Sequence, residues 1–316
     1  MNSAIESEYV MARKFGLTDF SRGFIEGAKL YLENREIRTD SGIAIVVGLV
    51  TAFPEKINYH TLNNSCEFHR LCATGHVAIL INDYMDMQEY LSKPEGRELK
   101  EKIEDGWKRT LEGIGFNKDL PEEKKTILKS YMAGITLLDD CIRSHPDNSC
   151  PGILKAKEIE NAISLVHCAA MILNSEEIDP HCLNLYEDIT QKSLEEKYRW
   201  LLNGEPQNEI QRRLCALYNV VMLSQTVDDY YDYSVDDKLS IRNIYSSILQ
   251  ENYGNQEMAN KKFAEIQSQY RDNAIRFGVS KMATLGNTIV LGIYKKMQYM
   301  FPNKYGGYRE RLCRMN

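Results

Sequence analysis

The sequence predicts an all-α fold, and three observations favour it. Apolar residues recur at spacings of three and four over segments of about 20 to 30 residues, which is the period of an amphipathic helix. Only eight prolines occur in 316 residues, and they stand at the breaks between these segments. Strand-like text is scarce, and GIAIVVGLV, its one candidate, is better interpreted as a buried helix because no partner strand exists. We therefore expect a single-domain helical bundle of about ten or more helices.

Each expected helix is bounded by a turn signal, because proline, glycine and clustered small polar residues end or interrupt helices. The turns are FPEKIN, KPEG, HPDNSCPG, NGEPQ, NYGNQ and FPNKYGG. The helices are expected near residues 5–14, 18–34, 41–52, 58–92, 96–114, 121–144, 153–173, 178–203, 207–237, 240–251, 255–277 and 280–300. No repeat of fixed period and no low-complexity linker is visible, so we expect one domain over residues 1–316.

The composition argues against several classes of protein. A formal net charge of −6, without a basic run, argues against a nucleic-acid partner. The longest apolar runs, IAIVVGLVTAF and VAILI, are shorter than the roughly 20 residues that a membrane-spanning helix needs. No secretory signal is visible in MNSAIESEYVMARKFG. Eight cysteines are scattered without a disulfide framework, so we expect reduced, mostly buried thiols and a cytoplasmic protein.

The first segment that suggests chemistry is ILINDYMDMQEYLSKP. Asp83 and Asp86 are three residues apart, so both carboxylates lie on one face of the expected helix. Glu89 follows after three more residues on the same side, and Asn82 precedes Asp83. Seven residues before Asp83, His76 lies on nearly the same face.

A second acidic segment is LSQTVDDYYDYSVDD. Asp228, Asp232 and Asp236 follow one another at steps of four, and Asp229 and Gln225 accompany them. Like charges at this spacing repel by about a few tenths of a kcal/mol per pair, so we expect a cation opposite them. Mg²⁺ fits because it prefers oxygen ligands and is usually shared between one or two carboxylates and a substrate phosphate. Two such helices could hold a diphosphate leaving group between them.

These residues resemble those of a known family. QTVDDYYDY resembles the second aspartate-rich motif of trans-prenyl diphosphate synthases, Q-x-x-D-D-x-x-D, and NDYMD is similar to the first motif, D-D-x-x-D, with Asn82 at its opening position. Asp83 and Asp228 lie 145 residues apart, which is similar to the motif spacing of the class I isoprenoid synthase fold. The resemblance covers about residues 65–240. It implies a helical bundle with a central active-site cavity that binds a prenyl diphosphate.

The resemblance also implies roles for individual residues. The ligands of a Mg²⁺ cluster of up to about three ions would be Asp83, Asp86, Glu89, Asp228, Asp232 and Asp236, of which Asp83, Asp86, Asp228 and Asp232 would carry catalysis. The substrate-binding residues would be Asn82, Lys192, Arg199, Gln225, Asp229, Tyr305 and Arg309. A carbocation needs a dry wall with aromatic faces, for which the candidates are His76, Tyr218 and Val221. As the alternative, these three are ordinary core residues.

Departures from the family decide between subclasses. Chain-elongating prenyl synthases follow the first motif with Arg-Arg-Gly-x-Pro, where this chain has YLSKPEGR. Without that second diphosphate site, ionisation of a single allylic substrate is favoured, as in a class I terpene synthase. The alternatives are a prenyltransferase, chain-elongating or head-to-head like squalene and phytoene synthases, and a non-catalytic helical binding protein, which Asn82 favours. Dimers are common in similar folds, so a homodimer stays open.

Two further groups of polar residues have the composition of possible metal sites. Asp139 and Asp140 form an acidic pair near a helix C-terminus, and we expect it to be a solvated surface feature. The spacing of Cys66, His69, Cys72 and His76 resembles that of zinc ligands, but on one continuous helix the four side chains cannot converge on a tetrahedral ion. Neither group predicts a metal centre.

Overall fold

The structure is a computed structural model, and it describes residues 49, 52–53, 84, 87–114, 120–144, 146–173, 177–185, 190–238 and 241–300. These residues form helices joined by turns, and no strand occurs among them, which confirms an all-α architecture for this part of the chain. Leu49, in the text GIAIVVGLV, is helical as expected. The helices predicted over 5–14 and 18–34, and most of those over 41–52 and 58–92, lie outside the described residues.

The helices are α6 (Gln88–Leu91), α7 (Arg97–Ile114), α8 (Glu122–Ser144), α9 (Cys150–Ile172), α10 (Pro180–Leu183), α11 (Gln191–Lys197), α12 (Arg199–Leu202), α13 (Glu209–Lys238), α14 (Ile244–Glu251), α15 (Gln256–Arg276) and α16 (Lys281–Met300), with a 3₁₀ helix, η1 (Pro94–Gly96). The predictions for α7, α8, α9, α13, α14, α15 and α16 are confirmed, with ends that differ by at most four residues. The earlier start of α9 has a local cause, because Ser149 caps it by accepting a bond from the Gly152 N–H.

The prediction of one helix over 178–203 is wrong. The described part of this segment forms α10, α11 and α12 instead. Ser130 of α8 holds the chain after α10, because its hydroxyl donates to the Leu183 carbonyl and accepts from the Leu185 N–H at 2.9 Å. Thr190 then starts α11 with a capping box that involves Ser193. Tertiary hydrogen bonds therefore replace the helical bonds that a continuous helix would need.

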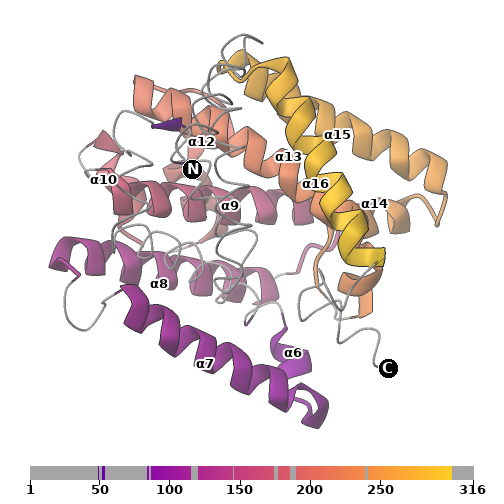
Figure 1. The fold of residues 1–316 in the computed structure, drawn as a ribbon, viewed down its shortest axis with the longest axis horizontal. Coiled ribbons are helices and arrows are strands. Elements are labelled where there is room, and N and C mark those ends of the chain that lie inside the picture. The colour runs from indigo at the N-terminus through magenta and orange to yellow at the C-terminus, as the bar shows by residue number, and fades with distance from the viewer. Residues whose placement is uncertain are drawn as a thin grey trace, which may run out of the picture.

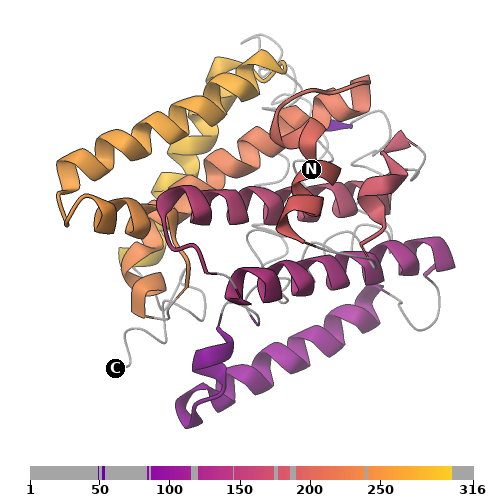
Figure 2. The same ribbon diagram turned by 180° about the vertical axis from the view of Figure 1, so that it is seen from behind.

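The long helix α13 lies in the middle of the bundle. Figure 1 shows α7, α8 and α9 lying one above another, and Figure 2 shows the same order from behind. α8 packs on α9, and α9 packs on α13. α13 also packs against α14, α15 and α16, and α16 crosses it in front in Figure 1. α13 therefore contacts three of the other long described helices, α9, α15 and α16.

The main core lies between α8, α9 and the first half of α13. Ile159 and Ile163 of α9 and Leu214 of α13 are fully buried within it. α9 is apolar on most of its surface, which suits a helix surrounded by others. Of the described cysteines, Cys150, Cys168, Cys182 and Cys215 are buried and Cys141 is half-buried, and all five are free thiols, in agreement with the expectation from the sequence. Among the described helices, none combines the length and the apolar character that crossing a membrane requires.

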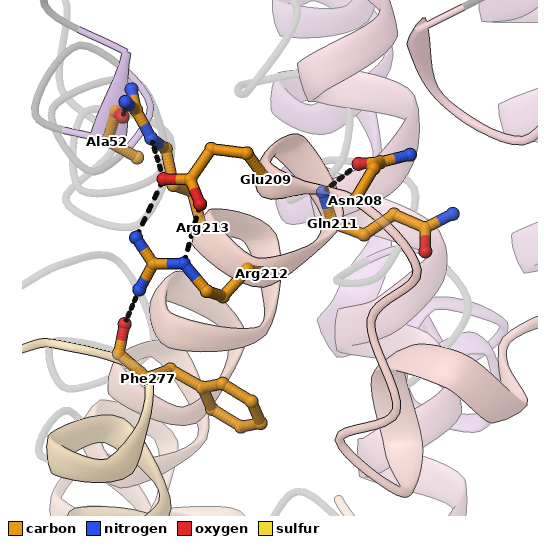
Figure 3. Close-up of polar contacts among 7 residues, drawn as sticks. All are labelled: Ala52, Asn208, Glu209, Gln211, Arg212, Arg213 and Phe277. Atoms are coloured by element: carbon orange, nitrogen blue, oxygen red, sulfur yellow. Dashed lines mark hydrogen bonds and ion pairs between the residues drawn. The ribbon is translucent and has the colours of Figure 1, made fainter.

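The N-terminal end of α13 is fixed by compensated charges. Glu209 accepts bonds from Nε and Nη2 of Arg212, both at 2.7 Å, and from Nε of Arg213 at 3.0 Å (Figure 3). Arg212 also donates to the Phe277 carbonyl at the end of α15, and Arg213 donates to the Ala52 carbonyl. The hydrogen bonds from Arg212 and then Arg213 lower the pKa of Glu209 to about 2. This ion-pair network ties α13 to two distant parts of the chain.

Candidate active site

Five aspartates lie in the last three turns or so of α13, and the four that are not fully solvated divide between two faces, while Asp237 is exposed. An α-helix completes one turn about every 3.6 residues, so side chains four or seven residues apart point in nearly the same direction. Asp228 and Asp232 form one pair, which contacts α16. Asp229 and Asp236 form the other pair, which bonds to the start of α14 and the residue before it. We call these four residues the acidic end of α13.

A single lysine of α16 bonds to both members of the first pair. Nζ of Lys295 donates to Oδ2 of Asp232 at 2.7 Å and contacts Oδ1 of Asp228. The Lys295 side chain is 11 % exposed, while the Asp228 side chain is 40 % exposed, so solvent reaches this carboxylate more easily than the ammonium. Burial lowers the pKa of Lys295, but Asp228 and Asp232 outweigh it, and the pKa lies above the ordinary lysine value. Lys295 is therefore a cation held between two carboxylates.

Asp229 is the most buried member of the acidic end, with 1 % of its surface exposed. Its Oδ2 atom accepts the Ile244 N–H at 2.7 Å, and its Oδ1 atom accepts Nε2 of Gln225 at 2.6 Å. Gln225, predicted from its spacing to share the face of Asp228, thus bonds to Asp229. Burial raises the pKa of Asp229 to about 7, Asp236 adds to the rise, and the charge of Lys157 opposes it.

Asp236 is also buried, and it is bonded to the turn that follows α13. Nδ2 of Asn243 donates to Oδ2 of Asp236 at 2.8 Å and to the Asp229 carbonyl at 2.9 Å. The Asn243 side-chain oxygen caps α14 by accepting the Ser246 N–H at 3.0 Å. Asn243 therefore links Asp236 to Asp229, while the charge of Asp236 also contributes to the raised pKa of Asp232.

The carboxylates of the acidic end interact with each other and with lysines of two other helices. Its four carboxylates interact with two lysines, Lys295 of α16 and the buried Lys157 of α9. Burial and the neighbouring Asp228 carboxylate raise the pKa of Asp232, in the same direction as that of Asp229. Crowded, buried carboxylates are relieved by taking up protons or by binding a cation. The four carboxylates are therefore crowded enough to shift the pKa of Asp229 and Asp232 upward.

Residues of the first acidic motif pack against apolar residues that neighbour the acidic end in the sequence. Tyr84 and Met87, which stand on either side of Asp86 in the sequence, belong to one apolar cluster with Val235 and Ile241 from the end of α13 and the turn after it. The other members of this cluster are Leu91, Ile103 and Trp107. Chain segments about 150 residues apart thus share a small core, and burying such side chains contributes about 1.5–3 kcal/mol each.

A chain of polar contacts joins the same two segments. Arg143 of α8 donates to the side-chain oxygen of Gln88 in α6 and pairs with Oδ2 of Asp139 at 2.5 Å. Oδ1 of Asp139 accepts Nη2 of Arg242, in the turn after α13, at 3.1 Å. We call Gln88, Arg143, Asp139 and Arg242 the brace. The prediction that the Asp139–Asp140 pair is a solvated surface feature is wrong for Asp139, which is 5 % exposed, and holds for the exposed Asp140.

Two predicted diphosphate-binding residues lie at the other end of α13. Lys192 and Arg199 are exposed on α11 and α12, and Arg199 pairs with Glu196 at 3.7 Å. α12 packs on the first half of α13, where Cys215 donates to the Trp200 carbonyl. Cys215 precedes the acidic end by about 20 Å of helix. The structure thus does not bring these two cations to the acidic end.

The remaining predicted residues divide between the core and segments that the structure does not describe. Tyr218 belongs to the main core, and its hydroxyl donates to the Glu158 carbonyl at 3.5 Å, while Val221 packs against the same core. Of Glu89, only its place in α6 is described. Asp83, Asp86, Asn82, His76, Tyr305 and Arg309 lie outside the described residues.

The donor set at the acidic end suits one wall of a Mg²⁺ site. Asp228 and Asp232 direct hard oxygen atoms at a single cation, as two carboxylate ligands of Mg²⁺ do. No group of three or more His, Cys, Asp or Glu side chains converges as a metal site among the residues that the structure describes. An ion here would therefore need further ligands, from Asp83 and Asp86, from water or from a substrate phosphate.

Sequence reasoning missed four polar residues of this region: Lys157, Lys295, Arg242 and Asn243. Asn243 carried a readable signal, because an Asn before an apolar run is a common helix cap. Lys295 and Lys157 carried none, since a lysine in a long helix is usually solvated and only the packing of α16 and α9 on α13 buries them.

Comparison of the chain with family models, with curated proteins and with solved structures finds no match.

Proposed function

We propose that the protein is a Mg²⁺-dependent class I terpene synthase, which ionises an allylic prenyl diphosphate and cyclises or quenches the resulting carbocation. The observation that carries the proposal is the apolar cluster in which Tyr84 and Met87 of the first acidic motif pack with Val235 and Ile241 beside the second. The brace of Gln88, Arg143, Asp139 and Arg242 joins the same segments independently. Both features support the expectation that the two motifs face one substrate.

In this proposal, the exposed and buried residues of the acidic end have different roles. Asp228 and Asp232 present their carboxylates for metal binding, and Asp83 and Asp86 do so from the first motif. Asp229 holds the start of α14 in place and so fixes the helix end that carries the ligands. When bound, Mg²⁺ neutralises the diphosphate and so promotes its departure as the C–O bond breaks. The apolar side chains around the motifs exclude water from the allylic cation.

A second function is favoured by Lys295. A chain that already neutralises Asp228 and Asp232 with its own lysine can bind a ligand at this site without a metal and without turnover. Asn82, in place of the first aspartate of the motif, points in the same direction. The protein would then be a non-catalytic helical binding protein.

The test is incubation of the full chain with geranyl, farnesyl, geranylgeranyl and geranylfarnesyl diphosphate, with and without Mg²⁺. Released pyrophosphate and extracted hydrocarbons are measured, the latter by mass spectrometry. We expect Mg²⁺-dependent release that falls at least about 100-fold in Asp83→Ala and in Asp228→Ala. The exposed Asp237 supplies the matched control, because Asp237→Asn on the same helix should retain activity.

Three outcomes would contradict the proposal. Normal turnover by both alanine variants would exclude the assigned site. Consumption of isopentenyl diphosphate alongside the allylic substrate would indicate a prenyltransferase instead. Absence of Mg²⁺-dependent pyrophosphate release with every substrate, combined with measurable binding of the diphosphates, would favour the binding protein.

A further inference from the structure

The ammonium of Lys295 occupies a position that a divalent cation would need. It contacts one oxygen of Asp228 and one oxygen of Asp232, on adjacent turns of the same helix face. Both are predicted metal ligands, and both contact the same ammonium. Two cations cannot share this position, because they would repel each other at contact distance.

Lys295 differs from the other cation of the acidic end in where it is attached. Lys157 lies on α9, within the main core, and interacts with the buried Asp229. Lys295 lies on α16, at the end of a flexible four-carbon side chain, and faces the more exposed pair of carboxylates. A lysine side chain can withdraw from such a position by rotation of its own bonds, without any movement of the helix.

We propose that Lys295 is a tethered cation that holds the place of one divalent ion on Asp228 and Asp232 and withdraws when that ion binds. The inference rests on the proposed function, since it concerns the same ligands. Without metal, Lys295 keeps the two carboxylates side by side and limits their repulsion. With metal, each binding event breaks two ion pairs, so Lys295 weakens the affinity of the site and raises the metal concentration that is needed to fill it.

The first test measures Mn²⁺ binding to the full chain by electron paramagnetic resonance, without substrate. We expect Lys295→Gln to bind Mn²⁺ at least about tenfold more tightly than the wild type, because the competing ammonium is gone. Lys296→Gln is the matched control, since Lys296 is the next residue of α16, carries the same charge and is exposed. Adding Asp228→Asn to Lys295→Gln should abolish the gain, which locates the ion.

The outcomes separate the two ideas. Equal Mn²⁺ affinity in the wild type and Lys295→Gln, with loss of binding in Asp228→Asn, would overturn the role of Lys295 and leave the proposed metal site intact. Binding of Mn²⁺ by neither protein would overturn both.

The second test uses the unmodified wild-type chain, so it does not depend on the folding of a variant. Lysines are acetylated briefly with and without Mg²⁺, and the modified positions are quantified by mass spectrometry. We expect Mg²⁺ to increase acetylation of Lys295 several-fold and to leave Lys296 unchanged. Protection of Lys295 that is the same with and without saturating Mg²⁺ would show a fixed structural ion pair and overturn the inference.

Discussion

The two ends of α13 shift the pKa of their carboxyl groups in opposite directions. At the N-terminal end, the Glu209 side chain is 54 % exposed, accepts bonds from Arg212 and Arg213, and has its pKa lowered to about 2. At the acidic end, Asp229 is 1 % exposed, and burial raises its pKa to about 7. The first arrangement stabilises the charged form of a carboxyl group, while the second stabilises the protonated form.

The difference teaches where the chain sacrifices stability. Matched charges near the surface change the free energy of unfolding little in either direction. Buried carboxylates that repel one another lower the free energy of unfolding. Proteins commonly keep such destabilising groups where they are needed for function. One helix therefore combines an end that serves the fold with an end that suits ligand binding, and the helical stretch between them, which includes the buried Leu214, separates Glu209 from Asp228 by about 28 Å.

The largest loss in the free energy of unfolding is expected from removing Asp139, which breaks the brace. Asp139→Ala leaves Arg242, with only 22 % of its side chain exposed, without this carboxylate, and it also removes the ion pair with Arg143. We expect a loss of about 2–3 kcal/mol in the free energy of unfolding, measured with urea at pH 7, because both arginines keep some access to water. Asp140→Ala, at the exposed neighbouring position, should cost less than about 0.5 kcal/mol.

Hydrogen exchange would show whether that loss is local. We expect Asp139→Ala to speed exchange in α6 and in the turn after α13, while the N-terminal end of α13 keeps its protection. Equal acceleration at both ends would mean that the two ends do not behave as separate regions, and the comparison between them would fail.

Most of the helical fold could be predicted from the sequence because the cause is local. Apolar spacing and turn signals such as NGEPQ placed the ends of α13 within two residues. The single helix over 178–203 failed because Ser130, more than 50 residues away, bonds to the chain at Leu183 and Leu185. Periodicity contains no information about such a tertiary hydrogen bond.

The candidate site could be predicted only in part. Motif spacing identified the aspartates, but counting in steps of four did not show which helix face each one occupies. Asp236 is eight residues from Asp228 but seven from Asp229, and seven residues complete nearly two turns, so it aligns with Asp229. The partner Lys295 could not be predicted, because its position depends on how α16 packs against α13.

An intermediate effect on the free energy of unfolding is expected from replacing the buried Asp229. The folded-state pKa of Asp229, about 7, exceeds the roughly 3.9 of an unfolded aspartate. The stability from its bound proton is therefore complete below about pH 4 and is lost as the pH rises through 7. Asp229→Asn removes this loss, so its unfolding free energy relative to the wild type should grow by about 1–3 kcal/mol from pH 5 to pH 8.

Hydrogen bonding does not oppose this substitution. The side-chain oxygen of the introduced asparagine can accept the Ile244 N–H, and its NH₂ group can donate to Gln225 once that amide turns over. Urea titrations at both pH values measure the difference, with the exposed Asp237→Asn as the control. A variant that is less stable than the wild type at pH 8 would show that Asp229 is ionised and well compensated, which would remove the contrast with Glu209.

The smallest effect is expected at the other end of α13. Glu209→Gln removes the carboxylate that Arg212 and Arg213 share, but the Glu209 side chain is more than half exposed, so water and salt already screen these pairs. We expect a loss below about 1 kcal/mol at pH 7, measured with urea at low salt, that shrinks further in 1 M salt. Glu205→Gln, at an exposed position before the helix, is the control.

A loss above about 2 kcal/mol that salt leaves unchanged would contradict this expectation. It would mean that Glu209 is needed to hold Arg212 against Phe277 and Arg213 against Ala52, and so to pack α13. Both ends of the helix would then be equally sensitive to their charges, and only the sign of the carboxyl pKa shift would distinguish them.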